Sequence, residues 1–272
     1  MILRSIFWCV ELFLNKIGFL SSSHIEIEVL YESSDYLIVN KPEDVYVNNH
    51  FKEKPSLDLL LSAKYPHLVN NNLEHSFYFV HRLDFVTSGV ICIALNKKAC
   101  AAASNRFQKR TSKKFYLALL RGHVSVNNLE LTKSIGYCSK EISGNHKMCT
   151  AENLTCIKPR FAHTKLVVIE RGIFMSYPAT KVILQLVTGR RHQIRVHCSE
   201  IGHTIVGDFT YSNRKDITPH RTFLHSYMLN LHIDNLKVQT DDPFTEEKLN
   251  GLWKPIEFIT KLNDFNTIEY FS

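Results

Sequence analysis

The sequence predicts an α+β domain, and two observations carry that prediction. Short apolar runs rich in β-branched and aromatic residues recur along the chain, which is typical of strands. Few helices separate them, only two of which have a clear pattern, and these are too few for a regular alternation of strand and helix. With 272 residues, 44% of them hydrophobic and 22% charged, the chain can bury the core of one domain with short extensions.

Each element is expected from its own local pattern. We expect strands in the apolar runs at residues 25–30, 36–40, 77–80, 90–95, 115–120, 165–170, 181–187 and 223–233. A short helix over 56–64 begins at Ser56 and ends before Pro66. An alanine-rich helix over 97–110 has one apolar side, and a third helix over 189–199 has Thr188 as its N-cap.

The less regular segments set the expected domain boundaries. Residues 1–25 form an amphipathic extension, 26–235 a catalytic domain, and 236–272 an accessory tail. The stretch 126–159 is rich in Asn, Ser, Lys and Cys, so we expect loops and an irregular hairpin there. In the extension, the uncharged run 5–10 is too short for a membrane span, and an amphipathic helix competes with a mitochondrial presequence. No membrane association is therefore expected.

Composition narrows the compartment and the class of partner. The net charge of +7 suits a polyanionic partner, although many basic proteins bind no nucleic acid. Seven cysteines, an odd number without a C-x-x-C pair, indicate free thiols in a reducing compartment. We expect an intracellular protein, cytoplasmic in the first place, with mitochondrial and nuclear locations as alternatives.

The most informative stretch is His81-Arg82-Leu83-Asp84-Phe85-Val86-Thr87-Ser88-Gly89. It places one carboxylate, Asp84, in a turn between two expected strands, where catalytic groups are often found. A lone Asp beside an Arg is more often a salt bridge or a turn former. The chemistry of these residue types alone therefore favours a structural role.

This stretch resembles the HRLDxxTSG signature of the RluA-type pseudouridine synthases. Further blocks match the family in order, at residues 35–42, 114–122, 186–197 and 202–208. The resemblance covers about residues 31–231. It implies a mixed, largely antiparallel central sheet in two halves, flanked by helices, with a cleft between the halves.

The reaction that the resemblance implies is isomerisation of specific uridines to pseudouridine in RNA. No atoms are gained or lost, so neither a redox cofactor nor ATP is needed. No H-E-x-x-H or Cys/His finger spacing occurs in the sequence, so no metal is expected either. In this family the aspartate is the nucleophile, here Asp84. The sequence leaves open which RNA is modified (tRNA, rRNA or mRNA), and we expect the protein to be a monomer.

The resemblance assigns roles to two further catalytic residues. Arg195 is the expected guanidinium partner of Asp84, although a solvated helix arginine is the structural alternative. Tyr116 is expected to stack on the target uracil, and its hydroxyl can take part in proton transfer at C5. The structural alternative for Tyr116 is packing in the core, the more frequent fate of a strand tyrosine.

Five residues are expected to contact substrate or to shape the loop around it. Arg82 would occupy the space left by the extruded nucleotide, since a stacked uridine cannot reach a buried carboxylate without flipping. His81 and Thr87 are expected to shape the loop more than to do chemistry. Arg190 would meet phosphate near a helix start, with a solvated surface position equally expected. Ile194 completes the substrate-binding set.

Two departures from the family pattern support an alternative. Glu43 and Asp44 follow Lys41-Pro42 where the family has a glycine, and acidic groups repel phosphate. Arg191 also replaces a small residue. The alternative function is therefore a catalytically weak or inactive RNA-binding relative with the same fold. A metal-dependent hydrolase based on His192, His197 and Cys198 is disfavoured, because residues five apart on a helix point to different sides.

Overall fold

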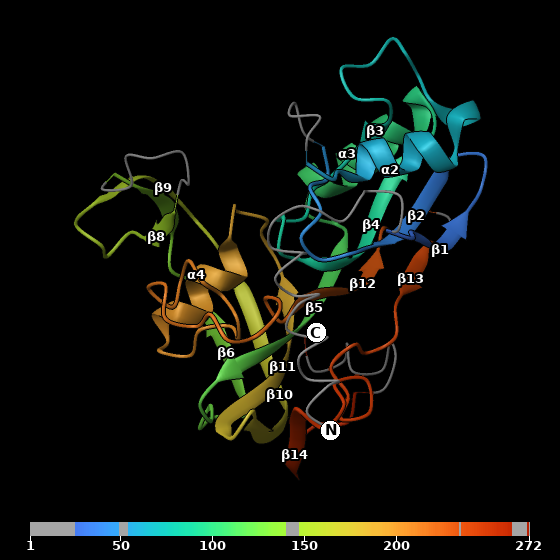
Figure 1. Cartoon of the computed structure of the whole chain (residues 1–272). Coiled ribbons are helices and arrows are strands. Elements are labelled where there is room, and N and C mark those ends of the chain that lie inside the picture. Colours follow the sequence, from blue (N-terminus) through green and yellow to red (C-terminus); the bar gives the residue numbers. More distant parts are fainter. Residues whose placement is uncertain (1–24, 49–53, 140–146, 234, 263–270, 272) are drawn as a thin grey trace.

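A mixed sheet organises the protein (Figure 1) in the computed structural model, which describes residues 25–48, 54–139, 147–233, 235–262 and 271. The strands are β1 (Glu28–Glu32), β2 (Tyr36–Lys41), β3 (Tyr78–Phe79), β4 (Ser88–Ala94), β5 (Lys113–Arg121), β6 (Asn128–Leu131), β7 (Ile135–Cys138), β8 (Met148–Thr150), β9 (Cys156–Arg160), β10 (Thr164–Phe174), β11 (Tyr177–Leu186), β12 (Leu224–Asn230), β13 (Lys237–Gln239) and β14 (Trp253–Phe258). The helices are α2 (Leu57–Lys64), α3 (Lys97–Gln108) and α4 (Gln193–Glu200), with a 3₁₀ turn at Pro66–Leu68.

Eleven strands join in one sheet with the order β1-β2-β4-β12-β5-β11-β10-β14, to which β13, β3 and β6 add at the side. Every strand pair in it is antiparallel except β12 with β4. The predicted fold class is therefore confirmed. Figure 1 shows β1, β2 and β4 with α2 and α3 in one half, β10, β11, β14 and α4 in the other, and β5 running between them.

The strand β4 is buried on both faces, because its alternate side chains enter two different cores. Ile91 and Ile93 lie in the main core, whereas Val90 and Cys92 pack with the helix α3 through Ala99. The small alanine side chains of α3 let the helix lie close on the sheet. This half therefore holds the start of β4, and the Asp84 loop before it, on a rigid support.

Gly89 permits the one parallel contact of the sheet. At this point β4 crosses β12, with Gly89 opposite Ser226. Its φ is +109°, and a Cβ there would lie 2.2 Å from the carbonyl oxygen of Ser226. Only glycine fits such an approach. Gly89 therefore joins the half that carries the Asp84 loop to the strand β12.

The predicted start of the third helix is wrong by four residues. The helix α4 begins at Gln193, and the preceding His192 has a left-handed φ of 54°. Thr188 is not its N-cap. Thr188 instead donates its hydroxyl hydrogen bond to Gln193 Oε1 at 2.7 Å, and the Arg190 backbone N–H donates to the same oxygen at 3.0 Å. The side chain of Gln193 thus fixes residues 188–192 as a loop.

The segment predicted as loops and an irregular hairpin does contain an antiparallel pair, β7 with β8, but it has more regular structure than expected. Its strands are β6, which pairs with β10, and a separate three-stranded sheet in the order β8-β7-β9. The expected C-terminal tail also contributes to the fold: β13 pairs with β12, β14 pairs with β10, and Trp253 is fully buried. The expected N-terminal extension lies outside the described residues, apart from its last one. No helix in the described ranges is long and apolar enough to span a membrane.

Candidate active site

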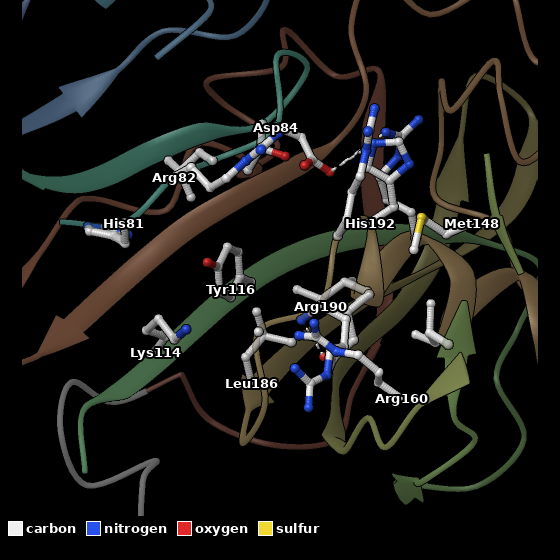
Figure 2. Close-up of a pocket in the computed structure, with 18 of the residues that line it drawn as sticks. His81, Arg82, Asp84, Lys114, Tyr116, Met148, Arg160, Leu186, Arg190 and His192 are labelled. Atoms are coloured by element: carbon white, nitrogen blue, oxygen red, sulfur yellow. Dashed lines mark hydrogen bonds and ion pairs between the residues drawn. The ribbon is translucent and has the colours of Figure 1, made fainter. Parts of the chain in front are cut away.

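A cavity of about 570 Å³ opens where β5 passes between the two halves of the sheet. Figure 2 shows the side chains that line it. They come from the Asp84 loop before β4, from the strand β5, from the small sheet β8-β7-β9, and from the loop that precedes α4. The volume lies within the range of about 300–1,000 Å³ that is usual for ligand sites.

Asp84 reaches into this cavity from the loop before β4. Its side chain is 18% exposed. One carboxylate oxygen lies 3.7 Å from Nη1 of Arg195 and 3.9 Å from Nε2 of His192. The Asp84 backbone carbonyl accepts a hydrogen bond from the Thr87 N–H at 3.1 Å, which closes the turn that presents the carboxylate. The acid is thus accessible, but it lies next to a fixed positive charge.

Arg195, on α4, is held by a second carboxylate. Its Nε and Nη2 donate to the two oxygens of buried Asp208 at 2.7 and 2.8 Å. The guanidinium also lies 5.0 Å from the centre of the Tyr211 ring. Burial opposes the charge, but the hydrogen bonds and charge of Asp208 outweigh it and raise the pKa of Arg195. Arg195 therefore presents a permanent and rigid cation to Asp84.

Tyr116 lies on β5, opposite Leu184 on one neighbouring strand and Ser226 on the other. Its ring faces the same cavity as Asp84 (Figure 2) and is almost fully buried. The Tyr116 hydroxyl shares a hydrogen bond with Ser226, and Ser226 Oγ also donates to the Val90 carbonyl at 3.0 Å. Burial raises the pKa of Tyr116 more than the hydrogen bond with Ser226 lowers it, and the charge of Asp84 raises it further. The phenol therefore keeps its proton at neutral pH.

His192 is the third group beside Asp84. Burial lowers the pKa of His192 to about 4 despite the nearby carboxylate, so the ring is neutral at physiological pH. Its Nδ1 lies 3.0 Å from the Tyr211 hydroxyl, whose oxygen accepts the Met148 N–H. In the tautomer in which the Tyr211 hydroxyl donates to Nδ1, the imidazole proton is on Nε2, on the side of Asp84.

The Lys41 side chain links the loop after β2 to the Asp84 loop. Its ammonium is completely buried and donates to the carbonyls of Pro42 and Val45 at 2.7 Å and of Phe85 at 3.2 Å. Burial lowers the pKa of Lys41 to about 7. Because Phe85 follows Asp84 directly, this lysine fixes the backbone beside the carboxylate.

Arg221 pairs with the first of the two acidic residues that depart from the family pattern. Its Nη1 lies 2.8 Å from Glu43 Oε2, and its Nη2 donates to Ser88 Oγ at 2.6 Å. The charge of Glu43 is therefore balanced inside the protein, which weakens the expected repulsion of phosphate. The same guanidinium ties this loop to the Ser88 end of the motif.

The sequence itself matches a known family. A sequence model described as RNA pseudouridylate synthase matches residues 35–200, a range that contains Asp84, Tyr116 and Arg195. The chain belongs to the RluA-type RNA pseudouridylate synthase family. The predicted enzyme class, an RNA pseudouridine synthase, is thereby confirmed.

Several RNA pseudouridine synthases are similar to this chain over most of its length. RNA pseudouridylate synthase domain-containing protein 1 of Danio rerio is 42% identical over 241 residues, covering 88% of this chain and 82% of that protein. Dual-specificity RNA pseudouridine synthase RluA of Escherichia coli is 32% identical over 207 residues, covering 75% and 85%. The solved structure of human RNA Pseudouridylate Synthase Domain Containing 1 superposes with a TM-score of 0.80 at 35% identity, covering 93% of this chain and 97% of that one.

The structure brings the expected catalytic residues into one cavity, and it also places the expected substrate-binding residues around it. Arg82 is exposed at the cavity wall, while Arg190 and buried Ile194 line the cavity, as does Thr87. His81 is a packed structural residue. Its Nε2 accepts the Cys92 N–H at 2.8 Å, its ring lies against Phe107, and burial lowers the pKa of His81 to about 3.

Three residues of the candidate site were not assigned from the sequence: Asp208, His192 and Lys41. Asp208 stands in a block that matches the family, but nothing in that block indicates that its partner is Arg195.

One of the residues considered as metal ligands, His197, already uses both ring nitrogens. They lie 2.9 Å from the Thr164 hydroxyl and 3.0 Å from the Lys133 carbonyl. No group of three or more His, Cys, Asp or Glu residues positioned to hold a metal occurs among the described residues.

Proposed function

We propose that this pseudouridine synthase isomerises uridines in RNA with Asp84 as the nucleophile. One observation carries the proposal: Asp84 is the only carboxylate among the described residues that line the cavity, which also holds eight Lys or Arg side chains. Such a cavity attracts a polyanion and offers it one acid. The same acid lies beside a fixed guanidinium and shares the cavity with a buried phenol.

The isomerisation breaks one bond, forms one bond and moves one proton. The ribose C1′–N1 bond breaks, the uracil turns, and C1′ bonds to C5; the proton on C5 leaves and N1 gains one. Asp84 can serve this sequence by attacking C1′, by attacking the base, or by assisting elimination to a glycal. In each route the cavity must retain the freed uracil, because its loss would end the reaction as hydrolysis.

The neighbours of Asp84 have complementary roles in this proposal. Arg195 attracts and orients the carboxylate, since Asp208 prevents the guanidinium from turning away. Tyr116 supplies a flat apolar face for the uracil and a phenol for proton transfer at C5. His192 is neutral and, when protonated on Nε2, can donate a hydrogen bond to Asp84. The two groups lie 3.9 Å apart, so this bond requires them to move closer together when substrate binds.

RNA must deliver the uridine to this site unstacked. Asp84 lies inside a cavity, so the target nucleotide has to flip out of its neighbours. Exposed Arg82, two residues before the nucleophile, is placed to fill the space that the nucleotide leaves. Arg191 Nε is buried and lacks a hydrogen-bond partner in the described part of the chain, so it remains available to an acceptor on the substrate.

The nucleophile assignment is tested with Asp84→Asn, which keeps the shape of the side chain and removes its charge. RNA carrying 5-³H-uridine is incubated with each protein, and tritium release is measured. We expect no release from the variant, an unchanged circular dichroism spectrum, and normal release from the control Asp241→Asn, whose side chain is 91% exposed. Release by Asp84→Asn at the wild-type rate would exclude the assignment.

The alternative of a weak or inactive RNA-binding relative makes a different prediction. In that case wild-type protein binds RNA but releases no tritium from total cellular RNA labelled with 5-³H-uridine.

We also propose that the enzyme is intracellular and monomeric. The intracellular location is supported by the six described cysteines, which are all free thiols, as a reducing compartment favours.

A further inference from the structure

We propose that Arg110, Arg160 and Arg190 form a phosphate-binding cradle for the RNA strand that flanks the target uridine. All three side chains line the cavity. Figure 2 shows Arg160 and Arg190 together, on the side of the cavity away from Asp84. The inference rests on the proposed function, because it extends the same RNA path beyond the flipped nucleotide.

The three arginines come from segments far apart in the sequence. Arg110 follows α3, in the half of the sheet that carries Asp84. Arg160 ends β9 in the small sheet, and Arg190 lies in the loop before α4. The cradle therefore spans the mouth of the cleft, where a strand leaving the uridine pocket must pass.

Like charges that converge without a counterion destabilise a fold unless a ligand balances them. Burial lowers the pKa of Arg190, and the charges of Arg160 and Arg110 lower it further, so the three guanidiniums lie close enough to repel one another. Within the described ranges, none of the three forms an ion pair with a carboxylate. A bound anion would balance the charges of these three guanidiniums.

The geometry of Arg190 favours a directional contact. Its Nε donates to the Phe161 carbonyl at 2.9 Å, which anchors the guanidinium and leaves the two terminal nitrogens for another acceptor. A planar fork with paired N–H groups matches two oxygens of one phosphate. Arg110 and Arg160 are both exposed, so they can reach a backbone that lies across the opening.

The wall around the cradle also suits bases. Tyr137, on β7, lines the same cavity and is 44% exposed, and Phe161, next to Arg160, is 51% exposed. Exposed aromatic rings beside guanidiniums are typical of surfaces that bind single-stranded nucleic acid, where bases stack and phosphates pair. We therefore assign an unstacked single strand, not a duplex, to this wall.

The test measures binding of a fluorescein-labelled twelve-nucleotide oligouridine by anisotropy over a series of salt concentrations. Arg110→Ala and Arg160→Ala are the main variants, because both side chains are exposed and their loss should not affect folding. Arg106→Ala is the matched control: it is also an exposed arginine of the α3 segment, but it does not line the cavity.

We expect each cradle variant to weaken binding by about tenfold at moderate salt, since it removes a charge-assisted hydrogen bond to phosphate. We also expect the slope of log K against log salt to fall by about 0.7 for each variant, the value for one phosphate contact on a single strand. Arg160→Lys, which keeps the charge, should recover part of the slope.

The cradle is refuted if Arg110→Ala and Arg160→Ala match Arg106→Ala in both affinity and slope. Failure of the proposed function would look different. In that case the wild-type protein releases no tritium from 5-³H-uridine RNA, while the affinity and slope differences between the cradle variants and the control remain.

Discussion

Asp208 binds Arg195 through two hydrogen bonds of 2.7 and 2.8 Å, and this pair orients the guanidinium beside Asp84. Asp208 is completely buried, whereas Asp84 is open to the cavity. One carboxylate thus serves to fix the cation, and the other is left for substrate. The division follows from burial, since a buried carboxylate needs a permanent partner and an accessible one does not.

Asp208→Asn should impair both stability and activity. The substitution removes the hydrogen-bonded carboxylate of buried Arg195 and leaves only Asp84, at 3.7 Å, to balance its charge, which costs up to about 3–5 kcal/mol of unfolding free energy. It also frees the guanidinium to turn away from Asp84, so tritium release should fall even at temperatures where the variant is folded. Urea unfolding and the release assay measure the two effects.

The control for this variant is Asp216→Asn. Asp216 forms a similar two-bond pair with Arg121 at 2.7 and 2.5 Å, but neither residue lines the cavity. We expect a loss of stability without a loss of kcat. Equal kcat values for Asp208→Asn and wild type would contradict the orienting role of Asp208.

Tyr116→Phe separates the two roles proposed for the tyrosine. The variant keeps the ring that would stack on uracil and removes the proton-transfer group. We expect kcat to fall by about a hundredfold or more while KM changes little. Tyr116→Leu should raise KM as well, because the flat surface is lost. If Tyr116→Phe retains full kcat, the hydroxyl has only its structural hydrogen bond with Ser226.

Gly89→Ala tests the crossing of β4 and β12. The added methyl would lie 2.2 Å from the Ser226 carbonyl oxygen, at a residue whose φ is +109°. We expect a loss of about 3 kcal/mol or more in unfolding free energy. Gly202→Ala is the control: its φ is +82° but nothing lies within 4 Å, so only the backbone term of about 1 kcal/mol should appear. Equal losses for the two variants would show that the strands can separate at little cost.

The buried histidine His225 should make folding sensitive to acid. Its ring nitrogens bond Ser88 at 2.7 Å and Thr240 at 2.6 Å, and burial lowers the pKa of His225 to about 3. The unfolded chain binds this proton below about pH 6.5. The stability that His225 contributes is therefore complete above that pH, and it is lost as the pH falls towards 3, by about 1.4 kcal/mol per unit.

The measurement is an NMR titration of the imidazole, assigned by comparison with His225→Gln. We expect the His225 resonances to stay those of a neutral ring at about pH 5, where the exposed histidines have titrated. A midpoint near 6.5 for His225 would show that the ring is solvated and that the Ser88–Thr240 link is absent.

Local patterns allowed the elements with strong periodicity to be predicted. The run 90–95 and the helix over 97–110 correspond closely to β4 and α3, because a buried strand and an alanine-rich helix each have a distinctive composition. The start of α4 was missed because the Gln193 side chain, not a Thr188 cap, satisfies the backbone there. The small sheet β8-β7-β9 was missed because its strands have only three to five residues, too few to show a period.

The sequence by itself determined the family and the identity of the candidate nucleophile, because the motif around Asp84 is contiguous and its residues are read in order. The tertiary structure alone decided what surrounds that carboxylate: the pairing of Arg195 with Asp208, the position of the His192 ring, and three arginines at the cleft that form no ion pair within the described residues. These depend on contacts between segments far apart in the chain. Such contacts are fixed by packing and burial, which no local pattern encodes.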